Sequence, residues 1–110
     1  MQTSAASEEE ADRLATIVLE RRLAACVQVV GPVRSRYWWQ GSVESATEWL
    51  CLAKTTDDLV DQVVASIRAA HPYDTPEVIV VAIVDGDRSY LQWVTDTVHE
   101  GRADGRVGEP

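Results

Sequence analysis

The sequence predicts one α+β domain whose elements follow the order β-α-β-β-α-β, with a further helix at the C-terminal end. Two amphipathic stretches at helical spacing, one long pair of strand-forming segments and one β-branched apolar run support this order. The 110 residues allow a single domain, and a hydrophobic share of 45% is enough for a core. We assign residues 1–100 to this domain and residues 101–110 to a flexible, Gly-rich tail.

The first helix is predicted between Glu8 and Arg22, because apolar residues recur there at helical spacing. Ser7 is suited to cap this helix, and Glu10, three residues further on, completes a capping box. Only residues 1–6 precede the helix and are available for the first strand. Their composition is poor for a strand, so we expect a short or degenerate one.

A long, twisted β-hairpin is predicted next. Its first strand covers residues 25–39 and is interrupted at Gly31-Pro32, where a bend or bulge is expected. Gln40-Gly41 marks the reversal, and the partner strand covers residues 43–55.

The second helix is predicted to begin at Thr55 or Thr56, either of which is a suitable cap. It ends near His71, because the proline that follows disfavours a helical residue before it. The β-branched run at residues 78–84 is typical of a central strand. The third helix is predicted from the apolar residues at positions 90–98.

Charge and cysteine usage exclude several classes of function. Acidic residues outnumber basic ones 18 to 10, so no nucleic-acid partner is expected. No apolar run approaches the ~20 residues of a membrane helix, and the N-terminus lacks the apolar region of a signal peptide. Cys26 and Cys51 lie in apolar runs and are interpreted as buried free thiols rather than a disulfide. We therefore expect a cytoplasmic protein.

The most distinctive segment is residues 71–77, which contain a histidine, a tyrosine, two prolines and two carboxylates. Such a connection could hold a site, with His71 as a ligand or an acid-base group. The alternative, which we favour, is that His71 ends the helix and bonds to the backbone while the prolines act as rigid spacers. The sequence contains no nucleophile-base arrangement and no phosphate-binding loop, so no enzyme activity is expected.

Several blocks, in this order and at these spacings, resemble the CutA family of divalent-cation tolerance proteins. The resemblance extends from about Glu8 to Val98. The proline-bounded heptapeptide and the aromatic hairpin tip are its most specific motifs. The blocks are Leu23-Ala24-Ala25-Cys26-Val27, Tyr37-Trp38-Trp39-Gln40-Gly41-Ser42-Val43, Lys54-Thr55-Thr56, His71-Pro72-Tyr73-Asp74-Thr75-Pro76-Glu77, Gly86-Asp87 and Tyr90-Leu91-Gln92-Trp93.

The resemblance implies a ferredoxin-like fold and a compact homotrimer in which long hairpins pair with the sheets of neighbouring subunits. Tyr37, Trp38 and Trp39 are then expected at the trimer interface. The residues support this independently, because three aromatic side chains near a hairpin tip are costly to leave in water. A long unpaired strand edge is a further liability that assembly removes.

The resemblance also suggests a metal. Some family members are linked to copper through a first-strand cysteine and adjacent histidines, but here Thr3 and Ala70-His71 occupy those positions. Only His71 is carried over as a candidate ligand for Cu(II) or another divalent cation, and no cofactor is required. Selective sites usually assemble three or four ligands, so residues shared across a trimer interface would have to complete it.

A second hypothesis is a signalling or small-ligand-binding trimer of the PII type, with clefts between subunits. Its candidate residues, besides His71, are Lys54, Tyr73, Asp74 and Glu77. Lys54 is the only lysine and could bind an anion near the start of the second helix. This hypothesis rests on analogy between folds alone, and each of the four residues also has a plain structural interpretation.

Overall fold

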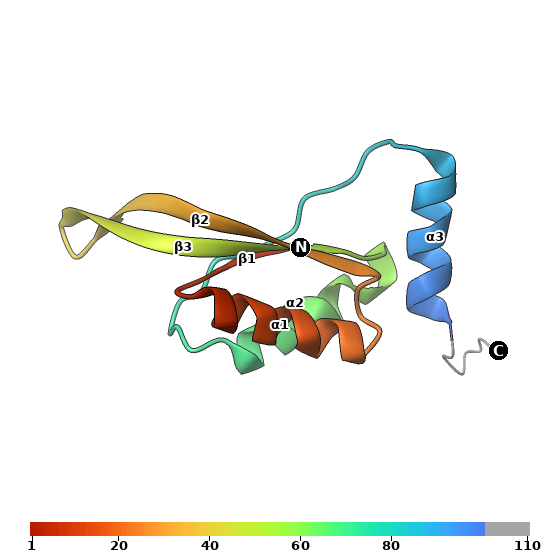
Figure 1. Cartoon of the computed structure of the whole chain (residues 1–110), viewed down its shortest axis with the longest axis horizontal. Helices are drawn as coiled ribbons and strands as arrows, with labels where there is room; N and C mark the ends of the chain where they lie inside the picture. Colours follow the sequence, from red (N-terminus) through yellow and green to blue (C-terminus); the bar gives the residue numbers. More distant parts are fainter. Residues whose placement is uncertain (101–110) are drawn as a thin grey trace.

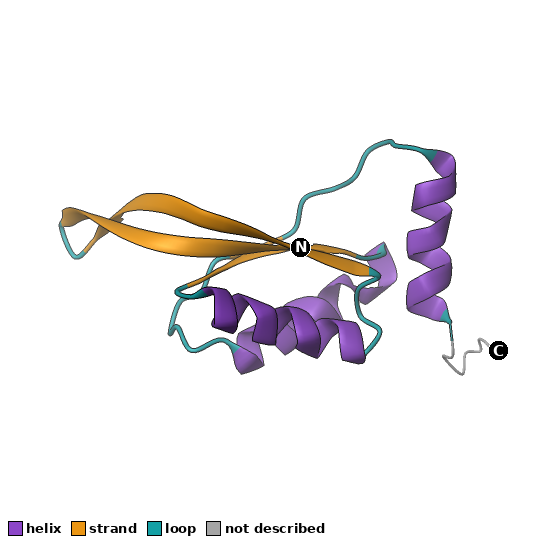
Figure 2. Cartoon of the chain, in the orientation of Figure 1, coloured by secondary structure: helices purple, strands orange, loops and turns teal. Residues whose placement is uncertain are grey.

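The computed structural model describes residues 1–100, and the predicted tail at 101–110 lies outside them. The predicted order of helices and strands is confirmed. The elements are β1 (Gln2–Ala5), α1 (Glu8–Glu20), β2 (Cys26–Trp39), β3 (Ser42–Lys54), a 3₁₀ turn (Asp57–Leu59), α2 (Val60–Ala70), β4 (Val78–Ile79) and α3 (Arg88–His99). The four strands form one antiparallel sheet with the order β2-β3-β1-β4. Figures 1 and 2 show α1 and α2 beneath one face of this sheet, while α3 stands beyond its end.

The N-terminal strand is short, as expected, but it is not degenerate. β1 lies inside the sheet and pairs with β3 from Gln2↔Leu52 to Ala5↔Trp49, and with β4 at Gln2↔Ile79 and Thr3↔Val78. Three of its four residues are buried. Pairing on both edges overrides the weak strand propensity of this segment, because propensity depends strongly on the neighbours that a strand finds. Its small side chains also leave room for α1 against the sheet.

α1 begins as predicted and ends two residues early. The Ser7 hydroxyl accepts a hydrogen bond from the Glu10 N–H at 3.1 Å, whereas the Glu10 carboxylate bonds to Arg13 instead of returning to Ser7. Half of the predicted capping box is therefore formed. The helix stops after Glu20, and Arg22 takes a left-handed conformation (φ 57°) that turns the chain toward the sheet.

The hairpin has the predicted length and the predicted irregularity. β2 and β3 pair from Cys26↔Lys54 to Trp39↔Ser42, and the register shifts between Val30 and Val33. The tip extends well beyond the helices (Figure 1). Much of the hairpin is therefore not needed for the core of its own chain.

The prediction of a central strand at residues 78–84 is wrong. β4 contains only Val78 and Ile79, it lies at the edge of the sheet, and residues 80–87 form no strand. β1 occupies the inner position instead. A β-branched run indicates an extended apolar segment but carries no information on which strands lie beside it. In one chain, residues 80–84 remain exposed.

The core lies between the helices and the sheet. α1 contributes Leu14 and Val18, α2 contributes Val63 and Ile67, and the sheet side includes Cys51. Full burial of each large aliphatic side chain stabilises the fold by roughly 1.5–3 kcal/mol. Cys51 is buried as predicted, whereas its counterpart Cys26 is only half-buried, and both are free thiols.

α3 is held to the body at its C-terminal half. Val98 is part of the core, and Val94 is buried as well. Arg22 donates to the carbonyl oxygen of Thr97 at 2.9 Å, and His99 lies 2.9 Å from the Asp58 carboxylate. Within residues 1–100, no helix combines the length and apolar character that crossing a bilayer would require.

Candidate functional site

His71 is a buried hydrogen-bonded joint at the C-terminal end of α2. Its Nε2 lies 2.7 Å from the carbonyl oxygen of Ser4, and its Nδ1 lies 3.2 Å from the backbone nitrogen of Tyr73. The Tyr73 N–H can only donate, so Nδ1 accepts and Nε2 carries the proton donated to Ser4. Both ring nitrogens are therefore used, and the ring links the end of α2 to the inner strand β1.

Tyr73 packs beside this joint. Its ring centroid lies 4.7 Å from that of His71, and its hydroxyl donates to the Glu48 carboxylate at 3.3 Å. Burial, followed by the negative charge of Glu48, raises the pKa of Tyr73. The side chain thus connects the heptapeptide to β3 as a neutral donor. Nothing about this environment activates it for chemistry.

Arg13 provides a second connection to the end of α2. Its guanidinium donates to the Ala70 carbonyl oxygen and to the Glu10 carboxylate. The hydrogen bond from Arg13 is the main cause that lowers the pKa of Glu10, and the positive charge of Arg13 adds to it. The last turn of α2 is therefore secured from both α1 and β1.

The structure does not bring the four proposed cleft residues into mutual contact. Tyr73 bonds to Glu48, Glu77 accepts a hydrogen bond from Gln2 at 2.8 Å, and Lys54 donates to Gln28 at 2.6 Å. Asp74 is exposed and forms no hydrogen bond with the described part of the chain. Each side chain thus has separate surroundings, and the four do not form a common binding site in a single chain.

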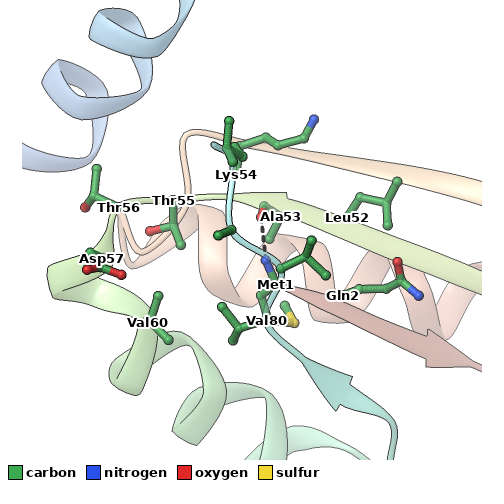
Figure 3. A pocket seen from close by; sticks show the side chains of 13 residues that line it. Met1, Gln2, Leu52, Ala53, Lys54, Thr55, Thr56, Asp57, Val60 and Val80 are labelled. Atoms are coloured by element: carbon green, nitrogen blue, oxygen red, sulfur yellow. Dashed lines mark hydrogen bonds between the residues drawn. The ribbon is translucent and has the colours of Figure 1, made fainter. Parts of the chain in front are cut away.

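A pocket of about 670 Å³ does lie beside Lys54 (Figure 3). It is bounded by the ends of β1 and β3, the start of the 3₁₀ turn and residues 80–83. Tyr73, Asp74 and Glu77 do not line it. Figure 3 shows the Lys54 side chain extending away from Thr56 and Asp57, so its ammonium is not directed toward that polar end of the pocket.

The residues of one chain do not fit a resident metal ion. Within residues 1–100, no group of three or more His, Cys, Asp and Glu side chains is arranged to hold one. Binding at His71 would require breaking one of its two hydrogen bonds. At the other position suggested by the resemblance, Thr3 is fully buried and its hydroxyl has no hydrogen-bond partner among these residues. A buried hydroxyl is a poor substitute for the soft thiolate that copper prefers.

The two cysteines differ in burial: Cys51 is buried, whereas Cys26 is half-buried. Burial raises the pKa of the Cys51 thiol to about 11, with a smaller contribution from the charge of Asp12. Its S–H donates to the Ala11 carbonyl oxygen at 3.3 Å. Cys51 therefore remains protonated at neutral pH, and it serves the core rather than chemistry.

The hairpin tip presents the predicted aromatic residues to solvent. Tyr37, Trp38 and Trp39 are all exposed, and Trp38 retains 75% of its accessible surface. No helix or strand within residues 1–100 covers them fully. The partners of the heptapeptide, Ser4 and Glu48, were not identified from the sequence, because they lie 67 and 25 residues away along the chain from the groups they bond. No local pattern signals such a contact.

Comparison with known proteins places this fold and these blocks in one family. A family model described as the CutA1 divalent ion tolerance protein matches residues 1–97. The chain belongs to the CutA1 family. The divalent-cation tolerance protein CutA of Archaeoglobus fulgidus is 39% identical over 95 residues, which is 86% of this chain and 92% of that protein. Its structure is described as that of a periplasmic protein.

Solved structures of CutA proteins agree with the fold. The Thermus thermophilus protein has a TM-score of 0.84 at 38% identity, covering 87% of this chain and 93% of that one. CutA1 from Oryza sativa has a TM-score of 0.86 at 36% identity, with coverages of 90% and 91%. Some curated CutA relatives are longer: this chain spans 61% of the Danio rerio protein, to which it is 40% identical, and 53% of a chloroplastic rice protein.

Proposed function

We propose that this CutA1 chain acts in divalent-cation tolerance as a ferredoxin-like homotrimer with a binding or structural role and no catalytic activity. The main support for this assembly is the number of large apolar side chains that one chain leaves exposed to water. Trp38 and Val84 are 75% and 93% exposed. Single exposed apolar residues are ordinary, but neighbouring ones mark an interface. Here Trp38 pairs with Val43 on the hairpin, and five of the six residues at 79–84 are exposed large apolar ones. The exposed set is Leu19, Val30, Tyr37, Trp38, Trp39, Val43, Ile79, Val80, Val81, Ile83, Val84, Tyr90 and Trp93.

The sheet topology supports the same proposal. β2 and β4 are the two edge strands, and residues 80–84 continue from β4 without a partner strand in the described part of the chain. Unpaired edges are liabilities that proteins cover. Pairing of one copy's hairpin with the open edge of the next is a head-to-tail contact, and such contacts form a ring when the rotation closes. We propose that the ring closes with three copies.

Light scattering coupled to size-exclusion chromatography tests the assembly. The expected mass is three times that of the 12.1 kDa chain. A Trp38→Ser/Trp39→Ser variant should shift the distribution toward monomer, because it removes aromatic area from the interface. Thr47→Ser, an exposed change on the same hairpin, is the control and should leave the mass unchanged. A wild-type monomer at micromolar concentration would refute the homotrimer.

For metal ions, we propose that divalent cations bind the assembly through ligands contributed by more than one copy. The support is the formal net charge of −8 per chain, together with the lack of a three-ligand cluster within residues 1–100. Calorimetric titration with Cu(II) and Zn(II) is the test. His71→Ala should bind with the affinity of the wild type, since the ring is fully hydrogen-bonded. A clear loss of affinity in a variant that remains folded and trimeric would show that His71 is a ligand.

The alternative of a PII-type ligand-binding trimer is not favoured. The relatives described above are CutA proteins, and the proposed cleft residues do not meet in one chain.

We also propose a cytoplasmic location, which is supported by the two free thiols. Fractionation of cells that express the untagged chain tests the location, and recovery in the periplasmic fraction would contradict it.

A further inference from the structure

Two arginines stand on one face of the hairpin without any acidic neighbour on that face. Successive side chains of a strand point to opposite faces, so Arg34 and Arg36, which are two residues apart on β2, lie on the same face. The register places Thr47 opposite Arg34 and Ser45 opposite Arg36, and the next pair toward the tip is Trp38↔Val43. Both arginines are exposed, and neither forms a hydrogen bond or an ion pair within residues 1–100.

The nearby carboxylates of β3 lie on the other face of the hairpin. Glu44 and Glu48 are paired with Tyr37 and Val33, so they belong to the opposite face of the hairpin. Glu44 accepts a hydrogen bond from Ser42, and Glu48 accepts one from Tyr73. The basic face is therefore not neutralised from within the hairpin.

This basic face is unusual for the chain that carries it. Acidic residues outnumber basic ones 18 to 10, and the formal net charge is −8. Copies of so acidic a chain repel one another as they approach. Figure 1 shows that the hairpin is the part extending furthest from the helices. The unpaired positive charges are thus placed on the element that would reach a second copy first.

We propose that Arg34 and Arg36 contact the acidic surface of a second copy of this chain and steer assembly. The inference rests on the proposed homotrimer and adds a role for charge to it. Exposed charges at an interface act mainly on the association rate and its salt dependence, because their field reaches only about a Debye length, ~10 Å at 0.1 M salt. Apolar contacts of the hairpin tip then hold the assembled state.

The test compares assembly rates of charge-reversed variants after dilution from denaturant, followed by light scattering at about 50 mM and about 500 mM NaCl. Arg34→Glu/Arg36→Glu is the test variant. Arg68→Glu/Arg88→Glu is the matched control, because those two arginines are also exposed and form no ion pair in the described part of the chain. Both variants change the net charge equally, so general repulsion is the same in both.

We expect wild-type assembly to slow by about tenfold at the higher salt concentration, because the local attraction of the two arginines outweighs the general repulsion between copies that salt also screens. The test variant should assemble more slowly than the control at low salt, and salt should accelerate it, because the steering interaction has become repulsive. Equal rates and equal salt dependence in the two variants would overturn this inference and leave the trimer intact. A wild type that never assembles would overturn the proposed trimer and this inference together. Circular dichroism verifies the fold, and Arg34→Gln/Arg36→Gln should lie between wild type and test variant.

Discussion

The imidazole of His71 and the carbonyl oxygen of Ser4, 67 residues apart in the sequence, are joined by a hydrogen bond of 2.7 Å. This bond ties the end of α2 to the inner strand of the sheet. The second ring nitrogen accepts from Tyr73, so the histidine also shapes the turn that leads to β4. The residue that most resembled a metal ligand in the sequence is therefore a joint between secondary-structure elements.

Replacing His71 by alanine should lower the free energy of unfolding by about 1–3 kcal/mol, because a buried carbonyl oxygen and a partly buried N–H lose their partner. Urea denaturation at a fixed chain concentration measures the change. His99→Ala is the control: its contact with Asp58 is exposed, and such pairs are worth about 0–1 kcal/mol. Equal losses in the two variants would contradict the structural role of His71.

Gly31→Ala should destabilise the hairpin. A Cβ at this position would overlap Cδ1 of Trp49, so the indole or the backbone would have to move, at a cost of about 1–3 kcal/mol. Gly86→Ala is the control, because its nearest contacts with Leu91 are at 3.5–3.6 Å. Thermal unfolding of both variants measures the difference. If the two glycine variants have the same melting temperature, Trp49 does not pack on Gly31.

Thr3→Val should stabilise the protein by about 1 kcal/mol, because it removes a buried hydroxyl that has no partner among the described residues and keeps the side-chain shape. Thr16→Val on the exposed surface of α1 is the control and should change stability by less than about 0.5 kcal/mol. Denaturant unfolding measures both. A loss of stability in Thr3→Val would indicate that the hydroxyl is satisfied in solution.

The two thiols should react at different rates with iodoacetamide. Cys26 is half-buried, whereas Cys51 is buried and its pKa is raised to about 11. The pKa is raised by folding, so the stabilising effect of the protonated thiol is present below the usual thiol pKa and is lost as pH rises toward 11. Mass spectrometry at neutral pH should find alkylation at Cys26 alone, with Cys51 reacting after unfolding. Rapid modification of Cys51 in the native protein would contradict its burial.

Predictions that depended on neighbouring residues were largely correct. The Ser7 cap, the bulge at Gly31-Pro32 and the end of α2 at His71 are confirmed. Each is a local event: a side chain reaches a backbone group within one turn, or a proline excludes a helical conformation before it. The free state of both cysteines also followed from their apolar surroundings.

Predictions about which segments meet were less successful. Residues 1–6 were expected to be a poor strand, yet β1 lies inside the sheet, and the run at 78–84 was expected at the centre but reaches only the edge. The partners Ser4 and Glu48 of the heptapeptide were missed as well.

The sequence by itself determined the order of the elements, the Ser7 cap, the hairpin reversal and membership of the CutA1 family, since these depend on residue type and spacing along the chain. The predicted cap at Thr55 or Thr56 is not formed, because Thr56 makes no side-chain capping hydrogen bond. Only the tertiary structure decided that β1 takes the inner place, that residues 80–84 pair with no strand of residues 1–100, and that His71 bonds to Ser4. The physical reason is that strand pairing and buried hydrogen bonds join groups far apart in sequence. Their formation depends on the packing of the whole domain.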